Sequence, residues 1–333
     1  MNISLTRRAA LGAASAALIP RFAHAAEFNI KIGSEIPAAH PSNVVAQEAA
    51  RRIKEETGGR VEMTVYPNNQ LGSGPDMLSQ VRSGALEMVI SSTQLISTLQ
   101  PIFAIPGLGF AFKEANTALA AMDGDVGAYM RKQLDSSSFS AFPKIFNSGF
   151  RQVTSSKAPI VRPEDFDGLK MRVPASPMWV SLFKSFGTSP VVINFAELYT
   201  ALQTKVVDAQ ENPLILLETN RLYEVQQFCT MTNHMWDGHW VLFNKGAMGR
   251  LPANLRAIVE KHMDQAAVEQ RVEIAKQEAQ LKERLVAKNL KFNDIQVEPF
   301  KAKLRSAGFY ASWREKFGQE PWKLLEKYAG TLA

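Results

Sequence analysis

Residues 28–65 read FNIKIGSEIPAAHPSNVVAQEAARRIKEETGGRVEMTV, and this stretch decides the fold class. Apolar and polar residues alternate over 28–33 and again over 61–65, which is typical of β-strands. Between them, residues 43–57 carry apolar or small side chains at helical spacing, and two glycines follow. Another helical pattern ends near Gly84, and a short apolar strand follows at 88–90. Strands and helices that alternate in this way predict a parallel sheet in an α/β fold.

The loops that follow these strands are the first place to expect a ligand. In open parallel sheets, ligands bind at the carboxyl ends of the strands. The loops here cover residues 34–41, 67–73 and 91–95. Their polar side chains are therefore candidate ligand-binding residues: Glu35, His40, Asn69, Gln70, Ser92 and Gln94.

The rest of the chain predicts a second β/α region and a long helix. Strands are expected at 140–147, 150–155, 169–173, 206–210 and 240–244. From 252 to 290 the pattern is that of one charged helix, long enough to brace two lobes. We expect lobe I to hold residues 26–148 plus about 238–277, and lobe II to hold 149–237 plus about 278–333.

The first 25 residues have the pattern of an export signal. Arg7 and Arg8 precede a short apolar run over 9–19, and Ala23-His24-Ala25 matches the small-x-small cleavage pattern. The paired arginines suggest the twin-arginine route. Cleavage after Ala25 predicts a periplasmic protein, and no later segment has 18 consecutive apolar residues that could anchor it in a membrane.

Composition argues against several other classes of protein. Beyond residue 25 there are 35 basic and 32 acidic residues without a basic run, so a nucleic-acid partner is not expected. The single cysteine, Cys229, cannot form an internal disulfide or a cysteine metal cluster. Motifs for a catalytic nucleophile, a phosphate-binding loop or a paired-histidine metal site are absent from the sequence. We therefore expect neither catalytic residues nor a cofactor or metal.

Three motifs between residues 149 and 213 carry the strongest functional signal: GFRQVT at 149–154, DGLKMRVP at 167–174, and FAELYTALQ at 195–203 running into VDAQENP at 207–213. Arg172 ends a short apolar strand, where its planar guanidinium can reach a crevice and match a carboxylate. Asn212 ends another strand and can donate to the second carboxylate oxygen. Phe195 begins a helix and can wall a pocket. An arginine at a strand end fits an interdomain salt bridge as well, so this pattern alone leaves both interpretations open.

Taken together, these motifs resemble the substrate-binding proteins of tripartite ATP-independent periplasmic (TRAP) transporters, the DctP-like family. The resemblance extends over essentially the whole mature chain, although Lys205 and Ala209 stand where the family carries glycine. It implies a two-lobed periplasmic binding protein fold with a ligand cleft between the lobes. It also implies that Arg172 clamps a ligand carboxylate, that Arg151 and Asn212 lie beside it, and that Phe195 packs on the ligand.

The resemblance implies a monomeric solute-binding protein that passes a small organic acid to the permease subunits of a TRAP transporter. A binding protein of an ATP-driven importer and an exported enzyme acting on an organic acid are the alternatives. Trp179, Trp236 and His239 are further ligand candidates, although residues 236–240 also fit hinge packing. Glu35, if it faces the pocket, favours a hydroxylated ligand, because a carboxylate accepts hydrogen bonds from hydroxyl groups and repels a second carboxylate. The sequence leaves the identity of the acid open.

Overall fold

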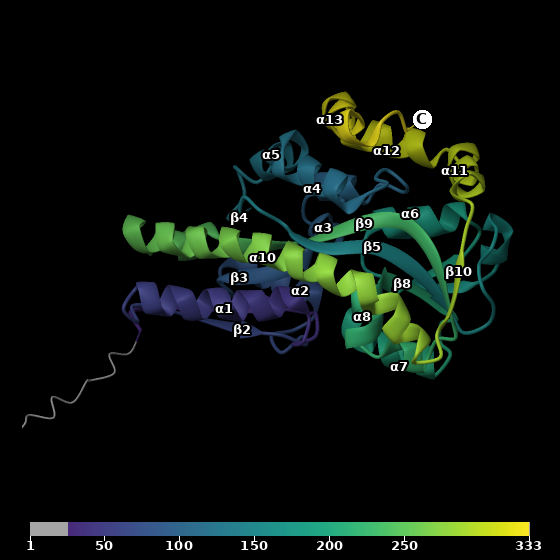
Figure 1. Cartoon of the computed structure of the whole chain (residues 1–333). Helices are drawn as coiled ribbons and strands as arrows, with labels where there is room; N and C mark the ends of the chain where they lie inside the picture. Colours follow the sequence, from purple (N-terminus) through teal and green to yellow (C-terminus); the bar gives the residue numbers. More distant parts are fainter. Residues whose placement is uncertain (1–25, 333) are drawn as a thin grey trace, which may run out of the picture.

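A single mixed sheet of ten strands organises the protein (Figure 1), in a computed structural model that describes residues 26–332. The order along the sheet is β2-β1-β3-β9-β5-β8-β6-β7, and β4 and β10 also pair with β9. The proposed export signal at 1–25 lies outside the described residues. Among the helices of the described part, none is long and apolar enough to cross a membrane.

The alternation predicted for the start of the chain is confirmed. The elements are β1 (Phe28–Ser34), α1 (Pro41–Glu56), β2 (Val61–Tyr66), α2 (Gly74–Ser83) and β3 (Met88–Ser92), and β1 runs parallel to both β2 and β3. Ser73 and Asp76 form a capping box that begins α2, and Gly84 ends it in the left-handed conformation. The carboxyl ends of β1 and β3 consequently lie side by side.

Two long strands, β5 (Phe146–Ser155) and β9 (Phe228–Asn244), cross the middle of the sheet. Residues 239–244 of β9 pair with β3 and β4 (Phe139–Ala141), whereas residues 228–231 pair with β10 (Lys291–Asp294). The sequence prediction of one strand over 140–147 and of a strand confined to 240–244 is therefore wrong. The apolar pattern of β9 is interrupted by the polar residues Thr232, His234 and Asp237. The interior of the sheet can hold them because buried side-chain hydrogen bonds satisfy them.

The second half of the sheet carries β6 (Lys170–Val173), α6 (Pro177–Ser185), β7 (Ser189–Val192), the short helix η3 (Phe195–Glu197), α7 (Leu198–Gln203), β8 (Ala209–Pro213) and α8 (Leu214–Thr219). Here β6 is parallel to β7 and β8, and β8 is antiparallel to β5. The strand expected at 206–210 begins later, at Ala209, because Lys205 ends the helix with a φ of 58°. The four-residue strands β7 and β10 were not predicted.

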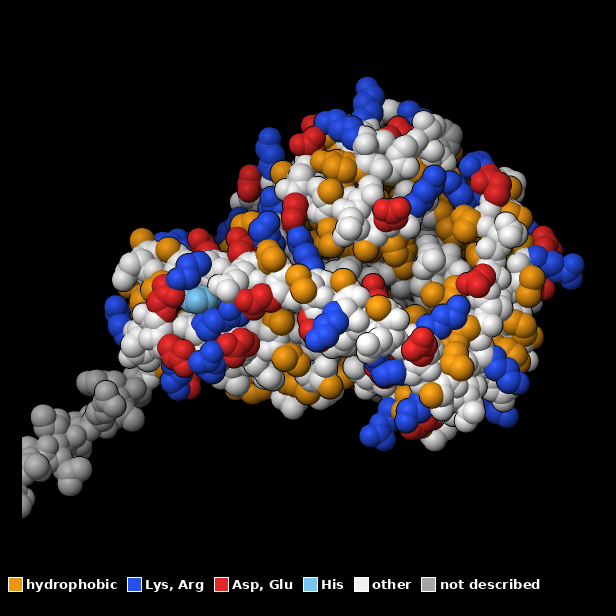
Figure 2. Space-filling model, in the orientation of Figure 1, with side chains coloured by type: hydrophobic (Ala, Val, Ile, Leu, Met, Phe, Trp, Pro, Cys, Tyr) orange, Lys and Arg blue, Asp and Glu red, His pale blue; other side chains and the backbone are white. Residues whose placement is uncertain are grey.

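The helix α10 (Ala253–Val286) confirms the predicted long helix and packs against α1, β5 and α8. Near its middle, Glu269 accepts an ion pair of 2.6 Å from Arg52 of α1. Near its end, Arg284 reaches Glu218 of α8 at 2.7 Å. Figure 2 shows acidic and basic side chains interspersed along this face rather than gathered by sign. The helix is thus tied to elements of both predicted lobes.

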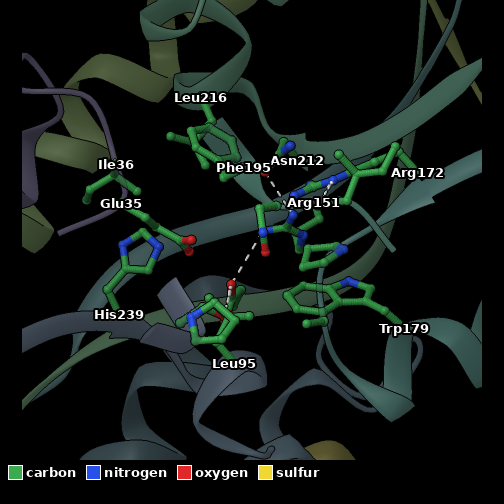
Figure 3. A pocket seen from close by; sticks show the side chains of 17 residues that line it. Glu35, Ile36, Leu95, Arg151, Arg172, Trp179, Phe195, Asn212, Leu216 and His239 are labelled. Carbon is green, nitrogen blue, oxygen red and sulfur yellow. Dashed lines mark hydrogen bonds and ion pairs between the residues drawn. The ribbon is translucent and has the colours of Figure 1, made fainter. Parts of the chain in front are cut away.

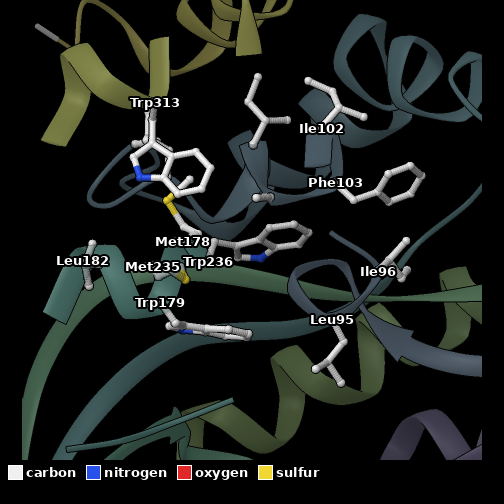
Figure 4. Packing of buried hydrophobic residues seen from close by; sticks show 14 of the residues in the cluster. Leu95, Ile96, Ile102, Phe103, Met178, Trp179, Leu182, Met235, Trp236 and Trp313 are labelled. Atoms are coloured by element: carbon white, nitrogen blue, oxygen red, sulfur yellow. The ribbon is translucent and has the colours of Figure 1, made fainter. Parts of the chain in front are cut away.

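Helices α11 (Val297–Ser306), α12 (Phe309–Phe317) and α13 (Gln319–Ala329) close the chain. They cover η1 (Pro101–Gly107), α4 (Ala115–Asp123) and α5 (Asp125–Lys132), and Tyr310 donates to the Gly109 carbonyl at 3.0 Å. Trp313 joins the buried cluster around Trp179 and Trp236 (Figure 4). The C-terminal helices therefore also contact the segment that was assigned to lobe I, and the lobe boundaries stay a prediction.

The remaining short elements connect these units. They are α3 (Thr93–Ile96), η2 (Pro163–Phe166), η4 (Leu222–Glu224) and α9 (Lys245–Gly249). Of these, α3 begins directly after β3 and brings Leu95 to the site described next.

Candidate functional site

A cavity lies where both halves of the sheet meet (Figure 3). The space between its lining residues, with its opening to solvent included, amounts to about 460 Å³. The first half of the chain contributes the loops after β1 and β3, and the second half contributes β6, η3 and β8, while β5 and β9 form the floor. Eight of the lining residues were predicted from the sequence: Glu35, Ser92, Arg151, Arg172, Trp179, Phe195, Asn212 and His239.

Arg172, on β6, is a positively charged residue of the cavity whose guanidinium has hydrogen-bond donors without partners. Its side chain is 1% exposed, and its Nε donates to the Ile193 carbonyl at 2.9 Å. Its Nη1 is buried without a hydrogen-bond partner, and no described carboxylate lies within ion-pair distance. Burial lowers the pKa of Arg172 to about 10, so the group stays charged at neutral pH. A buried charge with a free donor calls for an anion from outside the chain.

Arg151, on β5, is by contrast compensated by the protein. It forms a buried ion pair with Glu211, and its Nη2 also donates to Asn212 Oδ1 at 2.8 Å. Its Nη1 lies 3.4 Å from Asp237 Oδ2, and its guanidinium stacks 4.6 Å from the centre of the Trp179 ring. Arg151 therefore orders the floor of the cavity and positions Asn212.

Glu35 points into the cavity from the loop after β1, and in Figure 3 it enters from the side opposite Arg172. Its carboxyl group makes no hydrogen bond or ion pair with any described residue. Burial raises the pKa of Glu35 to about 7, although Arg172 acts in the opposite direction. The loop backbone is fixed, because Asn69 donates to the Glu35 carbonyl at 3.2 Å.

Asp237 is a cavity residue that the sequence analysis missed. It accepts hydrogen bonds from Ser92 at 2.8 Å and from Thr93 at 3.2 Å, so it joins β9 to the end of β3. Beside it, His239 has a buried Nδ1 without a partner, and burial lowers its pKa well below the usual range. His239 is consequently neutral at pH 7. The sequence signal for Asp237 was only its place between two candidates, Trp236 and His239.

Five predicted residues do not line the cavity: the chain holds four of their side chains elsewhere, and the fifth residue is exposed. His40 caps α1 by accepting from the Ser42 amide at 3.2 Å, and Asn69 supports the Glu35 backbone. Gln94 donates to the Ala104 carbonyl at 3.0 Å, and Gln70 is exposed. Trp236 is buried and donates to Asn147 at 2.9 Å. Of the two interpretations of Trp236, packing fits its position, and Trp179 supplies the aromatic wall.

The other unpredicted lining residues are mostly apolar, and they are Ile36, Pro75, Leu95, Pro174, Ala175, Ile193, Asn194 and Leu216. Apolar residues of this kind carry no sequence signal that separates a cavity wall from a core. Within residues 26–332, no group of three His, Cys, Asp or Glu side chains is placed to hold a metal ion. The arrangement is suited to binding a small anion with polar groups at both ends.

Comparison with known proteins decides the family. The model of the family described as bacterial extracellular solute-binding protein, family 7, matches residues 32–312. The chain belongs to this family. The resemblance to DctP-like proteins inferred from the motifs is thereby confirmed.

Relatives of this family 7 protein bind acids of different kinds. The C4-dicarboxylate-binding periplasmic protein DctP of Rhodobacter capsulatus is 31% identical over 235 residues, which cover 70% of each chain. A TRAP periplasmic solute-binding protein of Sulfurospirillum deleyianum with bound succinate is 28% identical, with a TM-score of 0.85, and the match covers 92% of this chain and 99% of that one. The sugar acid binding protein of Advenella mimigardefordensis in complex with galactonate is 25% identical, with a TM-score of 0.87, covering 93% and 100%. The predicted α/β fold of two-lobed binding proteins is confirmed.

Proposed function

We propose that this family 7 protein captures a small organic acid in the periplasm through the acid's carboxylate and delivers it to the permease subunits of a TRAP transporter. The observation that carries the proposal is Arg172, a buried guanidinium in the cavity whose Nη1 has no partner. A ligand carboxylate would satisfy that donor and compensate the charge.

The surrounding residues support the same chemistry. Asn212 is 1% exposed and lines the cavity from β8, where its Nδ2 donates to Gln210 Oε1 at 2.6 Å and can give its second proton to a carboxylate. The Phe195 ring centre lies 5.9 Å from the Arg172 guanidinium and supplies an apolar wall. Arg151 donates a hydrogen bond to Asn212 Oδ1 and so fixes the orientation of the Asn212 amide. In this proposal Arg172 binds, Asn212 and Phe195 position the ligand, and Arg151 positions Asn212.

Membership of family 7 and the bound acids of the relatives favour a TRAP binding protein over the two alternatives. The relatives are solute-binding proteins, and two of them are described as periplasmic. The periplasmic location further rests on the export pattern in the first 25 residues. No particular contact in the cavity favours the alternative functions, a binding protein of an ATP-driven importer or an exported enzyme.

Native mass spectrometry of the full protein purified from the periplasm tests the proposal. We expect the wild type to carry a small acid, which Arg172→Ala loses. Arg82→Ala is the matched control, because Arg82 is an exposed arginine of α2 that does not line the cavity. A bound molecule without a carboxylate, retention of the acid by Arg172→Ala, or its conversion to a product would contradict the proposal.

A further inference from the structure

The charges around the cavity are arranged unevenly. Two arginines, Arg151 and Arg172, stand near three carboxyl groups, those of Glu35, Glu211 and Asp237. Arg151 forms ion pairs with Glu211 and with Oδ2 of Asp237. Arg172 alone has no carboxylate partner. The protein therefore leaves one cation free for a ligand, and every further negative charge would enter a region that is already rich in carboxylates.

Glu35 is the complementary feature at the other side of the cavity (Figure 3). Its carboxyl group has no donor within the described chain, whereas its backbone carbonyl accepts from Asn69. An ideal Cβ at Gly74 would lie 2.6 Å from Glu35 Oε2, so the group rests against the backbone at the start of α2. Glu35 is half-buried, and a ligand that donates to its carboxylate would supply the hydrogen bond that the described residues do not.

We propose that the ligand is a hydroxylated monocarboxylate, with its carboxylate on Arg172 and a hydroxyl group at its other end donating to Glu35. This inference rests on the proposed function, because it takes the Arg172 end as the carboxylate site. It adds the substrate class, which the relatives leave open, since one is bound to succinate and another to galactonate.

The hydroxyl group fits the Glu35 side for two physical reasons. A hydroxyl donates to an ionised carboxylate and forms a charge-assisted hydrogen bond, the stronger kind. A second ligand carboxylate has no proton to donate, and above pH 7, where Glu35 is mainly ionised, Glu35 and Asp237 would repel it. An alkyl chain would leave Glu35 without a donor and would gain only the apolar contacts of Ile36 and Leu95.

Calorimetry with two acid series of matched chain length tests the inference. The four-carbon series is erythronate, succinate and butyrate, and the six-carbon series is galactonate, adipate and hexanoate. Titrations at pH 8 keep Glu35 mainly ionised. The proteins are the wild type, Glu35→Gln, Arg172→Ala and the control Glu315→Gln, which removes an exposed carboxylate of α12.

We expect the wild type and Glu315→Gln to prefer the hydroxylated acid in at least one series. In Glu35→Gln, binding of that acid should weaken by about tenfold or more, because the hydrogen bond to a charged acceptor is lost, while the dicarboxylate of the same length should bind better. A dicarboxylate or plain acid that binds the wild type as tightly, or a preference that Glu35→Gln leaves unchanged, overturns the inference.

The Arg172→Ala arm separates this inference from the proposed function. If a dicarboxylate or plain acid binds best and its binding requires Arg172, the carboxylate site stands and the hydroxyl subsite is wrong. If none of the six acids binds, or if binding does not depend on Arg172, both the proposed function and the substrate class fail. Circular dichroism of each variant establishes that a loss of binding is not a loss of folding.

Discussion

Arg151 and Glu211 form a buried ion pair in which the guanidinium contacts the carboxylate through both Nε and Nη2, with side chains 3% and 0% exposed. Arg172 lies on the neighbouring side of the same cavity and has no such partner. Two arginines that look alike in the sequence therefore have different roles. One stabilises the folded chain, and the other is available to a ligand.

Arg172→Ala should weaken ligand binding by about 30-fold to several thousand-fold, because removing one partner of a buried charge pair costs about 2–5 kcal/mol. Arg172→Lys should also bind poorly, since an ammonium group keeps the charge but lacks the planar fork. Calorimetry with the acid identified from the native protein measures both effects, and Arg82→Ala serves as the control. Near-wild-type affinity in a folded Arg172→Ala protein would place the carboxylate site elsewhere.

Arg151→Ala should act first on folding. It leaves Glu211 buried without its main counter-charge, which costs about 3–5 kcal/mol. Urea unfolding of the ligand-free protein measures the loss. The double variant Arg151→Met/Glu211→Gln should recover part of it, because it removes the uncompensated charge. Unchanged stability of Arg151→Ala would show that the ion pair does not hold the floor of the cavity.

Glu35 should make the stability of the ligand-free protein depend on pH. Its pKa is about 7 in the folded chain and near 4.5 when the chain is unfolded. Between these values the folded state keeps a proton that the unfolded state releases, so this contribution to stability is lost as pH rises from about 4.5 to 7. The Glu35→Gln protein has no titrating group at this position, so its stability does not show this loss. Its melting temperature relative to the wild type should therefore rise across this window and level off above it, as measured by scanning calorimetry. Parallel profiles for the two proteins would contradict the prediction.

Gly74→Ala should alter ligand preference with little cost in stability. The added Cβ would lie 2.6 Å from Glu35 Oε2 and 3.0 Å from Leu95 Cδ1, and both atoms end side chains that can move. Binding of a hydroxylated acid should weaken several-fold as Glu35 shifts. Gly249→Ala is the matched control, because an added Cβ there meets nothing within 4 Å. Calorimetry and urea unfolding of both variants check the prediction, and identical affinities would show that Gly74 does not position Glu35.

The sequence predicted the elements whose pattern is local and the residues that sit in recognisable motifs. The helices α1 and α10 follow from spacing alone, and Arg172 and Phe195 follow from the motif around them. The length of β9 did not follow, because several of its polar residues are satisfied by partners that are distant in the sequence. Asp237, for example, accepts a hydrogen bond from Ser92, which is 145 residues away.

The candidate site could be predicted in part for the same reason. A polar residue on a strand-end loop can face the ligand or serve the scaffold, and its neighbours in space decide which. Gln94 faces away because the Ala104 carbonyl and Ser176 Oγ occupy its amide. Glu35 faces inward, and none of the described residues donates to its carboxyl group. These differences depend on contacts between segments that the local pattern does not encode.

The cavity must open before an acid can reach Arg172. Arg172 and Asn212 are each 1% exposed and Phe195 is 8% exposed, so the carboxylate site is covered. Its walls come from both halves of the chain, with Glu35 and Ser92 on one side and Arg172 and Phe195 on the other. The halves are joined by β5, β9 and α10, and we expect these elements to bend while each half stays packed, as in hinge-closing proteins.

We therefore expect ligand binding to close two lobes. Small-angle X-ray scattering of the ligand-free protein should give a larger radius of gyration than that of the saturated protein, with the mass of a monomer in both. The physical reason is that closure requires the Arg172 contact, so Arg172→Ala should not become more compact when the same acid is added, whereas Arg82→Ala should. Identical scattering curves for the free and saturated wild type would count against closure. In that case the acid would have to enter through the part of the cavity that is open to solvent, and the two halves would form one rigid body.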